Sequence, residues 1–313
     1  MGDERSRLQA RIAAELDQPV SEEARAICEA IRARHGAAVA AVVFYGSCLR
    51  QRSAHGLLDF FVIVDDYRSA YRSRRLAAAN ALLPPNVFYA ELGRGQATLR
   101  AKYGVVSRAD LERACAGRSH RCGLWARFAQ PLAAPYLRGA SEREWLAAAC
   151  GEAVCTAVRT GLASEGRSWQ AVHPGPFWCD LFRATYASEL RPERVGASDA
   201  IYAEQAPRFD AVLELAIGVL IERGDLELGS DPWHCRVRLR EPSARGLGAV
   251  AKSLAAVQLA KSALTFGDWV PYAVWKVERQ SGLRLEPSER QRRHPWIFAW
   301  PLVFRALRSR ALR

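Results

Sequence analysis

Several patterns that mark common protein classes are missing from this sequence. It has no uninterrupted apolar run of the roughly 18 residues that a membrane-spanning helix needs. Its N-terminal residues are acidic and lack the apolar stretch of a secretory signal, so no such signal is expected. The eight cysteines contain no Cys-x-x-Cys pair and no zinc-type spacing with histidine. We therefore expect reduced thiols, several of them buried, and no membrane-spanning helix.

Lysine is scarce, although the chain is strongly basic. The formal net charge is +12, and only four of the 45 basic residues are lysine: Lys102, Lys252, Lys261 and Lys276. A basic surface suits nucleic acid, anionic lipid or phosphorylated substrates. Because lysine and arginine are not interchangeable at a phosphate, each lysine is a candidate for a specific role.

The order of predicted elements in the first part of the chain indicates the α+β class. Apolar runs predict strands at residues 37–45, 57–64, 87–92 and 99–106. Helix signals predict helices at residues 21–35 and 69–82, and a third after Ser107, which forms a capping box with Asp110. We therefore expect residues 1–135 to form a mixed sheet packed by helices.

The middle of the chain, residues 136–242, is predicted to be mostly helical. Helices are expected at residues 141–161, with Ser141 and Glu144 as a capping box, and at 178–188 and 207–223. A hairpin of residues 226–228 and 235–239 follows. Helices followed by a hairpin indicate a winged-helix-like domain, which either binds DNA or serves as a packing module.

Residues 243–313 are predicted to contain further helices and a distinct amphipathic segment at 295–313. Trp296, Trp300 and Leu307 recur there at helical spacing, with arginines mainly elsewhere. Interfacial tryptophan and arginine are typical of a helix that contacts an anionic membrane surface. The alternative is an amphipathic helix that packs on the protein's own core.

The most informative motif joins two of the predicted strands. The first strand runs into Gly46-Ser47, and the second contains Asp59 near its start. This order resembles the nucleotidyltransferases of the DNA polymerase β superfamily. Glycine allows the backbone to approach a triphosphate, and the serine hydroxyl and N–H can donate to phosphate oxygens. A carboxylate such as Asp59 can hold the magnesium ion that neutralises the phosphates.

The motif departs from the superfamily in one respect. A second carboxylate usually follows two residues after the first, on the same face of the strand, but this chain has Phe61 there. Asp65 is about 20 Å further along an extended strand and cannot share one ion with Asp59. Asp65 and Asp66 are expected to be strand-end residues that organise the following loop. Glu91 is the nearest substitute, provided that its strand lies beside Asp59.

Five stretches, in order, resemble the mitochondrial translocator assembly and maintenance protein family. They are Tyr45-Gly46-Ser47; residues 58–66 with their lone leading aspartate; Lys102-Tyr103-Gly104-Val105-Val106-Ser107; Arg127 and Pro131, beside which Ala126 and Gln130 replace the family's glycine and lysine; and residues 186–191, where Ser188-Glu189 replaces Gly-Asp. The resemblance is clear over about residues 41–135 and fainter to about 225.

The resemblance implies a phosphatidate cytidylyltransferase. Such an enzyme converts CTP and phosphatidic acid into CDP-diacylglycerol and diphosphate with magnesium, in cardiolipin and phosphatidylglycerol biosynthesis. It also implies a nucleotidyltransferase domain, a winged-helix-like domain and a membrane-contacting C-terminal helix. A bacterial-type member would bind peripherally to the inner face of the cytoplasmic membrane, with no nucleic acid as a partner.

The resemblance also implies roles for individual residues. The catalytic residues would be Asp59 and Lys102, and the CTP-binding residues Gly46, Ser47, Lys102, Tyr103 and Arg127. Asp59 would be a metal ligand, with Glu91 as the second ligand expected from the strand argument above. As a compact ammonium, Lys102 suits triphosphate oxygens. Tyr103 would either stack on cytosine or pack in the core. Arg127 would either clamp a phosphate or form a salt bridge at the surface.

Two other functions remain open from the sequence alone. One is a nucleotidyltransferase that acts on an antibiotic or on tRNA, although such enzymes usually keep both carboxylates. The other is a catalytically degenerate protein that binds a membrane, a nucleotide or nucleic acid, which Phe61 favours.

Overall fold

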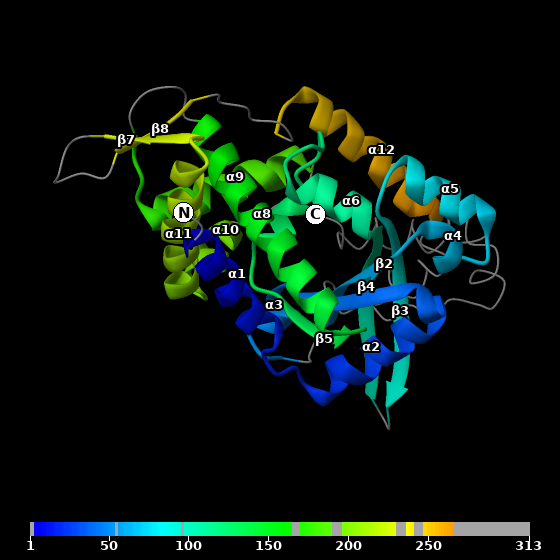
Figure 1. The fold of residues 1–313 in the computed structure, drawn as a ribbon. Helices are drawn as coiled ribbons and strands as arrows, with labels where there is room; N and C mark the ends of the chain where they lie inside the picture. Colours follow the sequence, from blue (N-terminus) through cyan, green and yellow to red (C-terminus); the bar gives the residue numbers. More distant parts are fainter. Residues whose placement is uncertain are drawn as a thin grey trace.

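A five-stranded mixed sheet forms the centre of the protein (Figure 1). The computed structural model describes residues 3–53, 56–94, 97–164, 170–189, 196–229, 236–240 and 247–265. The strands are β1 (Val39–Tyr45), β2 (Leu57–Val64), β3 (Asn86–Arg94), β4 (Ala97–Ser107) and β5 (Ala133–Leu137), in the order β3-β4-β2-β1-β5. Only β2 and β4 are parallel neighbours. The predicted α+β class and mixed sheet are confirmed.

Apolar side chains alternate between the two faces of the central strands, so both faces are covered. On one face Val43, Phe61 and Val106 belong to a core with α1 (Asp3–Leu16), α6 (Arg108–Cys115), α7 (Trp125–Phe128) and α8 (Ala140–Ser164). On the other face Phe44, Phe60 and Val105 pack with α2 (Glu22–His35), α4 (Tyr67–Ala70) and α5 (Arg74–Leu82). Burial on both faces explains why β1 and β2 read as continuous apolar runs.

The helical part of the protein packs on the first of these faces. It contains α9 (Pro174–Ser188), α10 (Ala197–Ala203) and α11 (Ala206–Glu222), and a small sheet of β6 (Gln170–Ala171), β8 (Arg236–Leu239) and β7 (Leu226–Leu228) in that order. The predicted hairpin is confirmed, with β6 as a third strand. The core is continuous from the large sheet into α8, α9 and α11. The proposed domain boundaries at 135 and 242 stay predictions.

Helix α1 was not expected from the sequence. Leu8, Ile12 and Leu16 recur every four residues, which places them on one face of the helix, and this face packs against α8 and α11. This four-residue spacing indicates a helix, although charged residues separate the apolar positions.

Helix α8 is the central helix of this core. It is the one helix among the described residues with the length and apolarity of a membrane span, and 78% of its most apolar window is buried inside the protein. The burial accounts for its composition, because a helix that is apolar all round is expected in a core as well as in a bilayer.

Two local predictions were wrong. The helix expected at residues 69–82 is two helices, because the chain leaves α4 and Ser73 then caps α5 by accepting the N–H of Leu76. The Ser141 hydroxyl bonds to the Glu142 carboxylate, so Ser141 and Glu144 form no capping box. By contrast, Ser107 caps α6 by accepting the N–H of Asp110, which confirms one half of the predicted capping box. The Ser107 N–H donates to the Tyr67 hydroxyl and not to Asp110.

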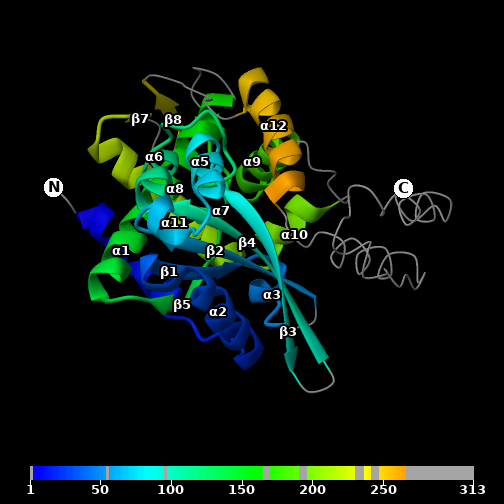
Figure 2. The same ribbon diagram turned by 90° about the vertical axis from the view of Figure 1, so that its right-hand side faces the viewer.

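The described chain ends with α12 (Ala249–Thr265), which packs against β3 and α9 (Figure 2). The Lys261 ammonium donates to the carbonyls of Ala79, Leu83 and Pro85, and the Gln258 amide donates to Pro85. These bonds attach α12 to the end of α5. The predicted membrane-contacting segment, residues 295–313, lies outside the described residues.

Candidate functional site

Asp59 lies in a row of polar side chains that crosses the sheet. Its register partners are Tyr45 on β1 and Lys102 on β4, and Lys102 in turn pairs with Tyr89 on β3. Directly paired residues of neighbouring strands project from the same face, so these four side chains share a face. The structure therefore brings the two predicted catalytic residues, Asp59 and Lys102, onto adjacent strands.

The Gly46-Ser47 turn closes over Asp59. Gly46 has φ 88°, a conformation that favours glycine, and a Cβ at this position would lie 3.2 Å from Asp59 Oδ2. Ser47 then begins the short helix α3 (Ser47–Arg50) and is exposed. The turn is fixed from the other side, because Arg50 Nε and Gln51 Nε2 donate to the Glu204 carboxylate at 2.7 and 2.9 Å.

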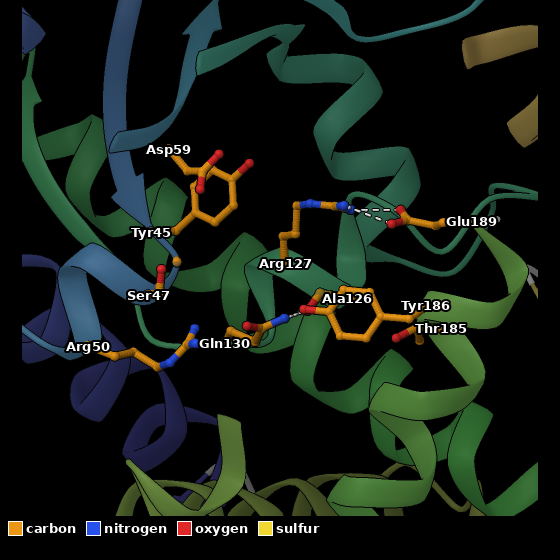
Figure 3. A pocket seen from close by; sticks show the side chains of 11 residues that line it. Tyr45, Ser47, Arg50, Asp59, Ala126, Arg127, Gln130, Thr185, Tyr186 and Glu189 are labelled. Atoms are coloured by element: carbon orange, nitrogen blue, oxygen red, sulfur yellow. Dashed lines mark hydrogen bonds and ion pairs between the residues drawn. The ribbon is translucent and has the colours of Figure 1, made fainter. Parts of the chain in front are cut away.

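A pocket of about 200 Å³ opens beside this turn. It is lined by Tyr45, Gly46, Ser47, Arg50, Asp59, Ala126, Arg127, Gln130, Thr185, Tyr186 and Glu189. Figure 3 shows Tyr45, Ser47 and Asp59 on one side and Tyr186 and Glu189 on the other, with Arg127 between them. We call this the Gly46–Asp59 pocket. Four predicted site residues, Gly46, Ser47, Asp59 and Arg127, meet in it; Lys102 is not among its lining residues.

Arg127 forms a bidentate ion pair with Glu189 inside the pocket. Nη1 and Nη2 each donate to a carboxylate oxygen at 2.7 Å, and Nη1 also donates to the Gly123 carbonyl. The side chains of Arg127 and Glu189 are only 12% and 18% exposed. Burial disfavours the guanidinium charge, but the Glu189 carboxylate outweighs this and keeps the pKa of Arg127 well above its usual value. Of the two predicted roles for Arg127, the structure shows the ion pair, although buried rather than at the surface.

Gly123 makes room for this ion pair. A Cβ at residue 123 would clash with Glu189 Oε1 and would lie 3.3 Å from Arg127 Nη1. Any larger residue there would push the carboxylate away from the guanidinium.

Phe61, two residues after Asp59, is part of the core beneath the pocket. It is 4% exposed, its ring stacks on Tyr45 with centroids 5.1 Å apart, and it contacts Phe128 at 5.2 Å. The layer beneath Tyr45 and Asp59 is therefore aromatic and apolar.

Tyr103 does not reach the pocket, which corrects the prediction that it binds CTP. It follows Lys102 on β4 and so projects from the opposite face of the sheet. It is 2% exposed, its ring stacks on Phe88 at 5.4 Å, and it meets His35 edge-on at 5.8 Å. Tyr103 is thus a core residue, the second of the two roles considered for it.

Glu91 is also displaced from its predicted role as a metal ligand beside Asp59. Strand β4 lies between β3 and β2, so the strand of Glu91 is not the neighbour of Asp59. The Glu91 carboxylate instead accepts bonds from the Tyr89 hydroxyl at 2.7 Å and from Arg100 Nε at 3.2 Å. The prediction required the strand of Glu91 to lie beside Asp59, and it does not.

Asp65 and Asp66 organise the end of β2, as expected. The Asp66 carboxylate accepts the N–H groups of Arg68 and Ser69 and caps α4. Asp65 forms a bidentate ion pair with Arg138 at 2.6 and 3.0 Å.

The donor set fits a magnesium ion that arrives with a nucleotide. Within the described ranges, no three His, Cys, Asp or Glu side chains are grouped as a metal site. Magnesium, however, is commonly held by one or two carboxylates together with substrate phosphates and water. Asp59 supplies one such carboxylate at the wall of the pocket.

Several pocket residues were not singled out as site residues from the sequence. Arg50 lies one helical turn after Ser47, which is a local signal for sharing a site. Tyr186 and Glu189 come from the end of α9 and were noted only as part of the resemblance. Compared with known families and curated proteins, the chain matches no family model and no curated sequence.

Proposed function

We propose that this protein is a nucleotidyltransferase, and specifically a phosphatidate cytidylyltransferase. The observation that carries the proposal is the meeting of Gly46, Ser47 and Asp59 at one pocket, with Lys102 on the strand next to Asp59. A Gly-Ser turn that closes over a carboxylate suits a triphosphate and its magnesium. The resemblance to phosphatidate cytidylyltransferases supplies the choice of CTP and a lipid phosphate.

The finer fold assignment is part of the same proposal. A DNA polymerase β-type domain is supported by the order of β1, the Gly46-Ser47 turn and Asp59 on the antiparallel strand β2. A winged-helix-like module is supported by α9 to α11 followed by the β7–β8 hairpin.

The chemistry of this reaction requires charge neutralisation more than proton transfer. A phosphate monoester has its second pKa at about 6 and is mainly a dianion at neutral pH, so it needs no strong general base. Its oxygen attacks the α-phosphorus of CTP in line, one P–O bond forms, and the bond to the diphosphate breaks. Magnesium, when held by Asp59, would supply positive charge to the phosphate oxygens.

The residues of this chain would perform the remaining work. Ser47 would donate its hydroxyl to a phosphate oxygen, and Lys102 would supply a localised positive charge beside Asp59. Tyr45 lines the pocket with Asp59, and Phe61 and Phe128 pack beneath it; this apolar layer would strengthen the electrostatic interactions of the carboxylate.

The test is transfer of label from radioactive CTP to phosphatidic acid in vesicles with magnesium. A lipid-soluble labelled product supports the proposal. Asp59→Asn should lower the rate about a hundredfold or more while the protein stays folded. Asp65→Asn is the matched control: Asp65 directly follows the end of the same strand and has an exposed ion pair, so full activity is expected. Retained activity in Asp59→Asn would remove Asp59 from the mechanism.

A second candidate function is nucleotide binding without catalysis. The buried Phe61 at the second carboxylate position and the Arg127 fork occupied by Glu189 favour it. CTP binding without any labelled product would support this alternative and overturn the transferase proposal. Turnover with another acceptor, such as an aminoglycoside or tRNA, would instead retain the reaction type and exclude the lipid substrate.

A further inference from the structure

A second, larger pocket lies between α6, α8 and the small sheet. Its volume is about 590 Å³, and it shares no lining residue with the Gly46–Asp59 pocket. Thr156 and Thr160, one helical turn apart on α8, are part of its lining, and both are at least 95% buried. Arg118, Arg159 and Arg240 line it from three different parts of the chain, together with Asp225. We call it the arginine pocket.

The arginine pocket carries an excess of positive charge. Three guanidinium groups face one carboxylate, and the contact from Arg159 to Asp225 is long, at 3.9 Å. Arg240 contacts Glu227 at 3.4 Å, but Glu227 is shared with Arg238. Arg118 is exposed and has no ion pair within the part of the chain that the structure describes. The pocket residues therefore neutralise only part of the charge that they bring together.

The partial negative charges of two helix C-termini do not neutralise the excess positive charge of the arginine pocket. The C-terminal ends of α6 and α11 lie at the pocket, and the Ala116 carbonyl accepts a bond from Arg159 Nη2 at 3.5 Å. A helix C-terminus is equivalent to about half a negative charge. Two such ends help to hold the guanidinium groups in place but leave a positive pocket.

The pocket is shaped around Arg159. Gly117 has φ 71°, and a Cβ there would lie 3.0 Å from Arg159 Nη2. Thr156 donates its hydroxyl to the Cys115 carbonyl, which fixes α8 against the end of α6. Thr160 is 3% exposed and makes no side-chain hydrogen bond to the described residues, so its hydroxyl is available to a ligand in the pocket.

We propose that the arginine pocket binds a small phosphorylated ligand. Guanidinium groups match phosphate oxygens in charge and in bidentate geometry, and a hydroxyl adds a neutral donor. The volume falls within the range of about 300–1,000 Å³ that is typical of small-molecule sites. The proposal does not depend on the proposed transferase activity, because no residue is shared between the two pockets.

The experiment measures binding of inorganic phosphate and of glycerol 3-phosphate to the full chain, by ³¹P line broadening at constant ionic strength. Arg118→Gln and Arg159→Gln should each weaken binding about tenfold, as expected for the loss of a charge-assisted hydrogen bond. Arg118→Gln is informative even if Arg159→Gln fails to fold, because Arg118 has no ion pair among the described residues.

Two controls separate this pocket from other basic sites. Arg113→Gln removes an exposed arginine of α6 that is outside the pocket and should leave phosphate binding unchanged. Ser47→Ala reports any phosphate that binds in the Gly46–Asp59 pocket and should not alter the binding that depends on Arg118. Equal losses in Arg113→Gln and Arg118→Gln would show general charge attraction and overturn the proposal, as would unchanged binding in both pocket variants.

A third set of measurements distinguishes a free phosphate ester from a lipid headgroup as the ligand. Vesicles of neutral lipid with and without phosphatidic acid are compared for binding to wild type and to Arg118→Gln. Soluble-ester binding without Arg118-dependent vesicle binding assigns the site to a free metabolite. Vesicle binding that requires both phosphatidic acid and Arg118 assigns it to a lipid headgroup.

Discussion

The ring of Phe61 lies against Gly104 on the neighbouring strand. The two residues are register partners of β2 and β4, and a Cβ at residue 104 would lie 2.8 Å from Phe61 Cε1. Phe61 lies two residues after Asp59, where the proposed nucleotidyltransferase function predicts a second carboxylate. The glycine of the Lys102-Tyr103-Gly104 stretch is therefore explained by packing: it provides the space that the aromatic ring fills.

Substitution of Gly104 tests this relationship. Gly104→Ala should lower the free energy of unfolding by about 1–3 kcal/mol, because the methyl group overpacks a buried ring. It should also displace Phe61 and with it Tyr45, so nucleotide binding should weaken. Gly93→Ala on β3 is the control, since a Cβ there has nothing within 4 Å. Urea unfolding of both variants makes the comparison, and equal stabilities would contradict the packing explanation.

Much of the sheet could be predicted because its signals are local. Continuous apolar runs identified β1 to β4, and Ser107 identified the start of α6. The turn after β1 and the aspartate on β2 meet because consecutive antiparallel strands pair directly, here as Tyr45 with Asp59. The short-range part of the site was therefore visible in the sequence.

The wrong site assignments have two different causes. Tyr103 could have been excluded, because successive residues of a strand face opposite sides and Lys102 and Tyr103 cannot both contact one ligand. The assignment of Glu91 depended on strand order, which is a tertiary property: β4 lies between β2 and β3.

The ion pair of Arg127 with Glu189 joins residues that are 62 positions apart, and no local pattern predicts their contact.

The ion pair of Arg127 with Glu189 should be important for stability because it is largely buried. Glu189→Gln removes the charge that compensates Arg127 at nearly constant size, and we expect a loss of about 2 kcal/mol in the free energy of unfolding. Glu227→Gln removes the partner of Arg238 in a pair whose side chains are 44% and 31% exposed, so its loss should be about 0–1 kcal/mol.

Chemical denaturation at low and high salt distinguishes the two pairs. Salt should reduce the already small effect of Glu227→Gln and leave that of Glu189→Gln nearly unchanged, because buried pairs are screened less. If both variants lose the same free energy of unfolding, or if Glu189→Gln loses none, the buried ion pair contributes no more to stability than the exposed one.

Lys261 should make stability depend on pH through the docking of α12. Burial, with a smaller contribution from the nearby Arg121 charge, lowers the pKa of Lys261 from 10.5 to about 8 in the folded protein. Between these values the unfolded chain holds a proton that the folded protein has released, so stability rises with pH. Below about pH 8 both states are protonated, and the folded state bears the full cost of the buried charge.

The difference in unfolding free energy between wild type and Lys261→Met isolates this contribution from the titration of cysteines and tyrosines. That difference should be constant below about pH 8 and should increase in favour of wild type up to about pH 10.5. Lys252→Met, at an exposed position of the same helix, should follow the wild-type profile. A flat difference for Lys261→Met across this range would show that folding does not lower the pKa of Lys261, and would contradict the predicted pH dependence.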